Sequence, residues 1–306
     1  MVTRTFHGRH AKVRFLMLSP MHDRKPASMT AAIGMLALGM AVLVACPAAS
    51  YAEQATTGAG TSSSISDDLN SVFKAQPCVQ SKSLAQLDAP ITRVAKRLDA
   101  HEPVTIVAVG SSSTGGSGAS SPAFSYPSRL ERELRVRFPD APITVINRGV
   151  NGEDTTSMMA RMDAVLEPKP DLVIWQLGTN TVLRDGNIPE TADVLRTGIS
   201  RIKKTGADVL LIDPQFAPRV NAKPAVSNMV GLIAYVAKQT NVPLFRRYVA
   251  MRHWHDDQAI AFDRFISADG LHMNDWGYSC LARLLAENIT ATVARSRAVA
   301  GVRPFQ

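Results

Sequence analysis

The sequence has few of the features that mark nucleic-acid-binding or membrane-spanning proteins. Only 6% of its 306 residues are aromatic and three are cysteine. After residue 52 it contains no long apolar run and no Lys/Arg cluster interleaved with aromatic residues. The net charge is +8, but residues 1–52 supply most of it, since they hold six Lys/Arg against one Asp. We therefore expect no nucleic-acid partner.

Nucleotide-binding motifs are also absent. The stretch "TIVAVGSSSTGGSG" at 105–118 passes from apolar residues into Gly, Ser and Thr, which is compatible with a linker, a phosphate-binding loop or a nucleophile turn. It lacks the Lys-Ser/Thr pair of a P-loop and the G-x-G-x-x-G spacing, so no cofactor is predicted. The stretch does not match the G-x-S-x-G motif of α/β-hydrolases either, because Thr114 occupies the position of the last glycine.

The N-terminal region predicts export. Residues 29–45 form an uncharged apolar run that follows a basic stretch and ends in small residues, as in an export signal at 1–52. The run is short and interrupted by glycine, so cleavage is favoured over a membrane span. Cleavage follows Ala52 or, as in bacterial lipoproteins, precedes a lipidated Cys46. We expect a periplasmic or secreted protein, attached to a membrane only through an uncleaved signal or lipidated Cys46.

The rest of the chain predicts one α/β domain. Residues 53–68 are rich in Gly, Ser, Thr and Ala and are expected to form a flexible leader before a folded domain at 69–306. Segments with helical spacing, and a last helix from about 274 to 297, separate short apolar runs without polar alternation, as in strands buried on both faces. This alternation predicts a three-layer α/β/α sandwich around a mostly parallel five-stranded sheet. The apolar runs lie at 104–109, 143–146, 172–175, 209–212 and 242–245, and the helical segments at 126–138, 191–206 and 227–240.

The cysteines are consistent with an oxidising compartment. Cys46 belongs to the predicted signal, so Cys78 and Cys280 are the two that remain. We predict a Cys78–Cys280 disulfide that ties the N-terminal segment to the last helix. Two buried thiols are the alternative.

Four histidines follow residue 52 and limit the candidates for a catalytic base. His101 lies just before the first predicted strand, away from the carboxyl ends where ligands gather. His253 and His255 share "RHWHDD", which is either a solvated polar stretch or a metal site, and we predict no metal. His272 in "DGLHMN" has Asp269 three residues earlier, so the carboxylate folds back on the imidazole across one tight turn.

The ends of the second and third predicted strands offer hydrogen-bond donors for a negative charge. The second is followed by "NRGVNGEDT" with Gly149 and Gly152, and the third by "QLGTNTV" with Gly178 and Asn180. A glycine lets its backbone N–H approach a ligand closely, and an asparagine donates from its amide. Each alone is equally typical of a turn or a helix cap, but together they occur in order at successive strand ends.

These blocks together resemble the SGNH (GDSL-type) hydrolases. "VAVGSSSTGG", "NRGVNGEDT", "QLGTNTV" and "DGLHMN" match the four blocks of that family in order, over 107–274. The resemblance implies a flavodoxin-like fold and ester hydrolysis without a metal. It implies Ser112 as nucleophile, His272 as general base and Asp269 as its orienting acid. The N–H groups of Ser112 and Gly152 and the side chain of Asn180 would form the oxyanion hole.

Two positions depart from the family pattern. Ser111 replaces the usual Asp before the nucleophile, and Thr181 replaces the usual Asp after the asparagine of the third block. Neither residue would carry a proton in the reaction. The choice of Ser112 over its neighbours Ser111 and Ser113 depends on its distance from Gly110 in the motif.

The resemblance predicts an exported serine esterase. We expect short-chain O-acyl esters as substrates, on small molecules or on cell-envelope or extracellular glycans. An O-acyltransferase that uses the same residues is one alternative. A non-catalytic glycan-binding module that kept the fold is another, and the two departures from the family pattern favour it.

Overall fold

A computed structural model of the protein describes residues 67–79, 81, 84 and 86–301. The predicted export signal at 1–52, including Cys46, and nearly all of the predicted leader at 53–68 lie outside the described residues. Within the described part, no helix is both long enough and apolar enough to cross a membrane.

The apolar runs form one parallel sheet with the strand order β2-β1-β3-β4-β5. Its central strands are almost completely buried, which explains their lack of polar alternation. The predicted five-stranded parallel sheet is thereby confirmed. The strands are β1 Val104–Gly110, β2 Ile143–Gly149, β3 Leu172–Gln176, β4 Asp208–Ile212 and β5 Leu244–Phe245.

The two edge strands differ from the prediction. The structure exposes Thr144, Asn147 and Arg148 of β2, so the expectation that this strand is buried on both faces is wrong. At the other edge, β5 has only two residues. Pro243 has no N–H to give to a neighbouring strand, and the N–H of Val242 closes the end of the preceding helix by donating to Ala237 O at 2.9 Å.

Helices fill the connections between the strands. The predicted helices are present as α4 Tyr126–Arg137, α8 Ile188–Lys204, α10 Val226–Gln239 and the last helix α13 Asp275–Gly301. Asn274 caps α13, because its Oδ1 accepts from Gly277 N at 3.1 Å. The other helical segments are α2 Thr92–Asp99, α3 Ser112–Gly115, η2 Pro122–Phe124, α5 Thr155–Ala160, α6 Met162–Leu166, α7 Thr179–Leu183, α9 Pro218–Asn221, α11 Arg247–Arg252, η3 His253–Asp257 and α12 Phe262–Phe265.

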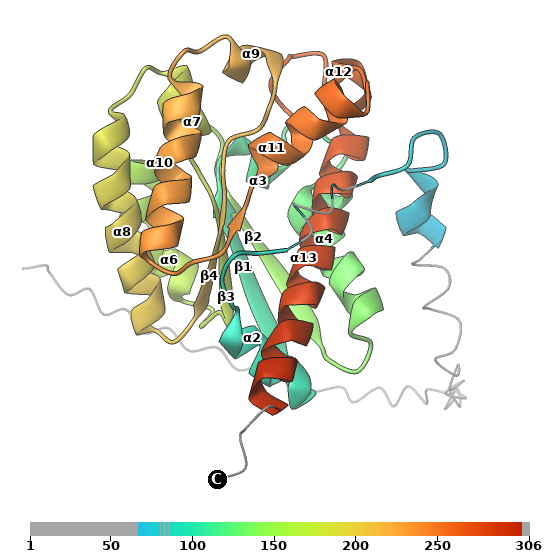
Figure 1. Ribbon diagram of the computed structural model, residues 1–306, viewed down its shortest axis with the longest axis vertical. Helices are drawn as coiled ribbons and strands as arrows, with labels where there is room; N and C mark the ends of the chain where they lie inside the picture. The colour runs from blue at the N-terminus through green and yellow to red at the C-terminus, as the bar shows by residue number, and fades with distance from the viewer. Residues whose placement is uncertain (1–66, 80, 82–83, 85, 302–306) are drawn as a thin grey trace, which may run out of the picture. The chain divides into compact units, whose positions relative to one another are not determined.

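The helices form layers on both faces of the sheet. Helices α4 and α13 cover one face, and α8 and α10 cover the other (Figure 1). The chain passes outward from β1 to β2 and, in the opposite direction, from β3 to β4. The connections that follow β1 and β3 therefore diverge. In sheets with this order, ligands bind at that divergence, outside the carboxyl ends of the strands.

The first described segment packs against the beginning of α13. The structure joins Cys78 and Cys280 by a disulfide with an S–S distance of 2.01 Å. Trp276 of α13 donates from Nε1 to Gln76 O at 2.8 Å, and its ring meets that of Phe73 edge to face. Because α13 begins three residues after His272, these contacts hold the helix that follows the histidine loop.

We predict that reducing this disulfide destabilises the domain. A bond that closes a long loop typically stabilises a protein by about 2–4 kcal/mol, which corresponds to roughly 5–15 °C in Tm for a domain of this size. The measurement is thermal unfolding with and without reductant, beside a Cys78→Ala, Cys280→Ala double variant. Reductant should lower the Tm of the wild type and leave that of the variant unchanged. Equal wild-type melting curves in both conditions would contradict the prediction.

Candidate active site

The serine-rich stretch forms a sharp turn from β1 into α3. Gly110 ends β1, Ser111 occupies the N-cap position of α3 without a side-chain capping bond, and Ser112 is the first residue of the helix. Ser111 and Ser113 are 2% and 1% exposed, whereas Ser112 is only partly buried. The N–H groups at the start of a helix have no partner within it, so the N–H of Ser112 is placed to donate to a ligand. Of the three serines, Ser112 is the one whose hydroxyl lies within hydrogen-bond distance of His272.

His272 meets Ser112 across 160 residues of sequence. Its Nε2 lies 2.7 Å from Ser112 Oγ, and its Nδ1 lies 2.5 Å from Asp269 Oδ2. The loop that carries it is held as a narrow turn, with Ser267 N donating to His272 O at 2.8 Å. Gly270 adopts φ +67° within this turn, a conformation that glycine reaches without strain. Three residues predicted from two separate motifs therefore form one chain of hydrogen bonds.

Asp269 is held in its ionised form. Partial burial would raise the pKa of its carboxyl, but hydrogen bonds from the His272 side chain, from the N–H groups of His272 and Leu271, and from the Ser267 hydroxyl outweigh it. The pKa of Asp269 therefore lies well below its usual range. A charged Asp269 accepts a hydrogen bond from the N–H of His272 Nδ1, which leaves Nε2 as the acceptor for the Ser112 hydroxyl.

Two of the predicted oxyanion-hole residues lie on the loops after β2 and β3. Gly152 has φ +79°, which favours glycine at this place in the "NGEDT" block. Asn180 lies in the first turn of α7 and donates from Nδ2 to Glu153 O at 2.8 Å. An amide has two N–H groups, so one remains for a ligand. Glu153 directly follows Gly152, and this bond therefore ties the two loops together.

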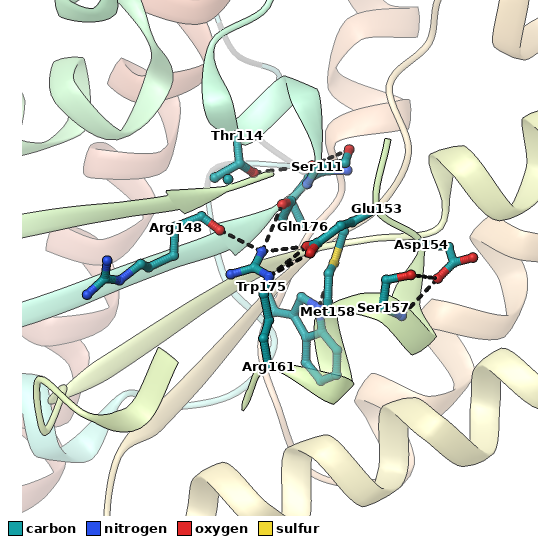
Figure 2. Close-up of polar contacts among 12 residues, drawn as sticks. Ser111, Thr114, Arg148, Glu153, Asp154, Ser157, Met158, Arg161, Trp175 and Gln176 are labelled. Carbon is teal, nitrogen blue, oxygen red and sulfur yellow. Dashed lines mark hydrogen bonds and ion pairs between the residues drawn. The ribbon is translucent and has the colours of Figure 1, made fainter. Parts of the chain in front are cut away.

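Gln176, the last residue of β3, connects the turn after β1 to the neighbouring strand (Figure 2). Its Oε1 accepts from Ser111 N at 3.1 Å, from Ser111 Oγ at 3.3 Å and from Thr114 Oγ1 at 3.2 Å. Where the family usually has an aspartate, this chain thus has a neutral hydroxyl bound to a neutral amide. Gln176 is not among the predicted site residues, although its position at the carboxyl end of a strand is the signal that would have found it.

Thr181, the other departure from the family pattern, is 7% exposed within α7. Its carbonyl accepts from Gly186 N at 2.8 Å, and its methyl group packs against Gly186. Thr181 therefore contributes to the packing between α7 and Gly186. Asn180, the residue before it, still donates to Glu153 O.

A second buried network links the loops that carry Asn180 and His272. Gln215, after β4, accepts on Oε1 from Thr179 Oγ1 and from Arg247 Nη2, both at 2.8 Å. It donates from Nε2 to Leu271 O at 3.3 Å. Thr179 precedes Asn180 and Leu271 precedes His272, so one amide joins both loops. No sequence motif identifies these residues, since they become neighbours only in the folded sheet.

The network contains two buried charged residues, Asp213 and Arg247. Burial raises the pKa of Asp213 to about 7, although the N–H of Tyr248 and the charge of Arg247 favour the carboxylate. Burial likewise lowers the pKa of Arg247 to about 10, against the attraction of Asp213. The charge of Asp213 therefore favours the charged form of Arg247, and the reverse.

The other histidines lie apart from this arrangement. His101 is in an exposed turn before β1. His253 Nδ1 pairs with Asp257 Oδ2 at 2.6 Å, and His255 Nδ1 lies 3.0 Å from Ile260 O. Within the described residues, His, Cys, Asp and Glu side chains form no cluster of three that could hold a metal ion.

The sequence is similar to curated esterases. Esterase TesA of Pseudomonas aeruginosa is 29% identical over 131 residues, which cover 42% of this chain and 60% of TesA. An arylesterase of Vibrio mimicus is 27% identical over 167 residues, or 54% of this chain and 78% of that protein. The chain thus spans less than two thirds of TesA.

A solved structure and a family model cover more of the chain. The two-domain esterase CEX, described as active on acetylated mannans, superposes with a TM-score of 0.59 at 23% identity, over 71% of this chain and 58% of that one. This likeness shows the fold. The model of the Non-GDSL lipase-like family matches residues 77–295, which include the serine turn, the two segments that carry the predicted oxyanion-hole residues and the His272 loop. Since this match covers far more than half of the sequence, the chain belongs to the Non-GDSL lipase-like family of SGNH-type hydrolases.

Proposed function

We propose that this protein is a serine esterase that hydrolyses carboxylic esters through an acyl-enzyme, with Ser112 as nucleophile. The main support is the 2.7 Å contact between Ser112 Oγ and His272 Nε2, with Asp269 on the other ring nitrogen. A hydroxyl, an imidazole and a carboxylate in this order form the arrangement that activates a serine. The names of TesA and the Vibrio arylesterase support an ester as substrate.

In the first half-reaction, Ser112 Oγ attacks the carbonyl carbon while its proton passes to His272 Nε2. Asp269 stabilises the resulting imidazolium. The carbonyl oxygen gains a negative charge, which the N–H groups of Ser112 and Gly152 and the side chain of Asn180 stabilise. When the C–O bond breaks, the leaving alcohol takes the proton from His272 and the acyl group stays on Ser112.

Water completes the reaction. It attacks the acyl carbon and gives its proton to His272 Nε2, and the same donors stabilise the second oxyanion. The carboxylic acid leaves as the proton returns to Ser112 Oγ. Every group in this cycle belongs to the chain, the substrate or the attacking water.

We further propose an exported enzyme, periplasmic or secreted, that acts on short-chain O-acyl groups of glycans. The apolar run at 29–45 and the Cys78–Cys280 disulfide favour a compartment outside the cytosol. CEX, a protein of the same fold, is described as active on acetylated mannans, which supports a sugar ester as the substrate.

Replacing Ser112 by Ala should lower kcat for p-nitrophenyl acetate by at least about 10⁴-fold, because the acyl group loses its acceptor. Ser111→Ala is the matched control, since its hydroxyl contacts Gln176 and not His272. We expect a loss of no more than about tenfold for that variant, in keeping with a positioning contact. A fluorophosphonate probe should label the peptide that contains Ser112. Full activity of Ser112→Ala, with Ser111→Ala inactive, would show that Ser111 is the nucleophile instead.

The pH dependence should show a single ionisation on the acid side. The low pKa of Asp269 keeps its carboxylate charged across the acid side of the profile, so it adds no ionisation there. An imidazole that holds a proton on both nitrogens cannot accept one from Ser112. Activity should therefore fall as pH falls, and log(kcat/KM) should have a slope of one against pH. Asp269→Asn should lower kcat by about 10⁴-fold by favouring the wrong tautomer. A slope of two would mean that a second group, Asp269 or the buried Asp213, also gains a proton on this side of the profile, against a single ionisation.

The glycan proposal predicts release of acetate from acetylated mannan by the wild type and none by Ser112→Ala. Acetate in solution is measured with and without added deacetylated mannan as an acceptor. Hydrolysis of p-nitrophenyl acetate without release from the polysaccharide would reject the glycan substrate and leave the esterase proposal intact. Acetylated acceptor in place of free acetate would identify an acyltransferase.

A further inference from the structure

A salt bridge lies beside the site without taking part in the chemistry. Arg161 follows α5, and its Nε donates to both carboxylate oxygens of Glu153 at 2.8 Å (Figure 2). Arg161 Nη2 also lies 2.6 Å from Glu153 Oε2. The two side chains are 23% and 15% exposed, so water screens this pair only partly.

The same guanidinium reaches the ends of two strands. Arg161 Nη2 donates to Arg148 O at 2.7 Å, one residue before the end of β2 (Figure 2). It also lies 3.4 Å from Gly110 O, at the end of β1. Gly110 is two residues before Ser112. The planar guanidinium holds its N–H groups in fixed directions. Arg161 therefore fixes Glu153 relative to the strand that leads to Ser112.

The backbone of Glu153 in turn contacts Asn180, which follows β3. Its carbonyl accepts from Asn180 Nδ2 at 2.8 Å. The direction of the Asn180 amide, one of the three proposed oxyanion-hole donors, therefore depends on where Glu153 lies. An oxyanion hole works only when its donors are held close to their productive geometry, since a displacement of about 1 Å can cost 10²-fold in rate.

We propose that Arg161 and Glu153 are positioning residues of the oxyanion hole. The salt bridge fixes the Glu153 carbonyl, and that carbonyl orients the Asn180 amide toward the oxyanion formed on Ser112. This inference rests on the proposed function, because it assumes that Asn180 is an oxyanion-hole donor. A salt bridge that is largely buried is weak evidence for stability, because the loss of hydration offsets its attraction. Its contribution here is geometric.

The test is a double-mutant cycle with p-nitrophenyl acetate as substrate. Asn180→Ala should lower kcat by about 10²–10³-fold. Arg161→Met should lower kcat by about 10–100-fold with KM changed by less than about threefold, because it displaces a donor needed in the transition state. The double variant should lie within about threefold of Asn180→Ala alone, since Arg161 acts through that amide. Arg161→Lys, which keeps the charge, should fall between Arg161→Met and the wild type.

The matched control is a salt bridge at the opposite end of the sheet. Arg93 Nε donates to Asp171 Oδ1 at 2.7 Å, and Asp171 Oδ2 accepts from the N–H of Thr105 at the start of β1. Arg93→Met should lower the Tm and leave kcat unchanged. If Arg161→Met does not fold, Arg161→Lys and Glu153→Gln take its place, with the same dependence on Asn180 expected.

The outcomes separate this inference from the function on which it rests. Wild-type kcat in Arg161→Met, with Asn180→Ala impaired, would overturn the positioning role and leave the esterase mechanism standing. Independent, multiplying losses in the double variant would also overturn it. Wild-type kcat in Asn180→Ala would remove Asn180 from the oxyanion hole, and the inference would fall with that assignment.

Discussion

The site depends on the divergence of the chain after β1 and β3. These strands are neighbours in the sheet, yet the connections that follow them leave in opposite directions. The turn with Ser112 and the turn with Asn180 therefore begin side by side at the carboxyl edge of the sheet, where sheets of this order bind ligands. The loop after β2 brings Gly152 to the same edge. A parallel sheet of this order places the serine and its candidate oxyanion donors together before any side chain makes a specific contact.

Neutral groups secure the serine turn. The Ser111 N–H lies in a buried turn and needs a partner, because an unpaired buried N–H costs about 1–3 kcal/mol. Gln176 provides that partner from the adjacent strand. A carboxylate in the place of Ser111 would have to lose its hydration or be paired. The neutral hydroxyl of Ser111 avoids this cost, and Gln176 Oε1 accepts from it and from Thr114, one turn along. The replacement of the family's usual aspartate by Ser111 therefore does not leave the serine turn unsupported.

Chain periodicity and local spacing were enough to predict the central strands and the Asp269–His272 pair. Uninterrupted Val, Ile and Leu runs identified the strands, and the spacing of the pair is a single turn whose geometry hardly depends on the rest of the chain. The burial of β2 was predicted wrongly because an apolar run does not reveal which strand lies at an edge. Gln176, Arg161 and Gln215 were missed for a related reason. Each contacts a partner between 13 and 65 residues away in the sequence, so only the strand order brings them together.

The glycines of "GSSSTGGSG" allow the His272 loop to approach the serine turn. Gly118 has φ +88°, and a Cβ on it would lie 2.5 Å from Met273 O and 2.9 Å from His272 Cβ. Any side chain there would push the histidine loop away from Ser112. The residues on either side are bound to the beginning of α13, where Tyr278 donates to Ser117 O at 2.7 Å and the N–H of Ser120 donates to Asp275 at 2.8 Å.

The same helix carries the Cys78–Cys280 disulfide, so α13 is held from both sides. The stretch that reads as a linker by composition is thus a docking surface for the histidine loop. The absence of a side chain at Gly118 is what lets the His272 loop come close enough for Ser112 Oγ and His272 Nε2 to lie 2.7 Å apart.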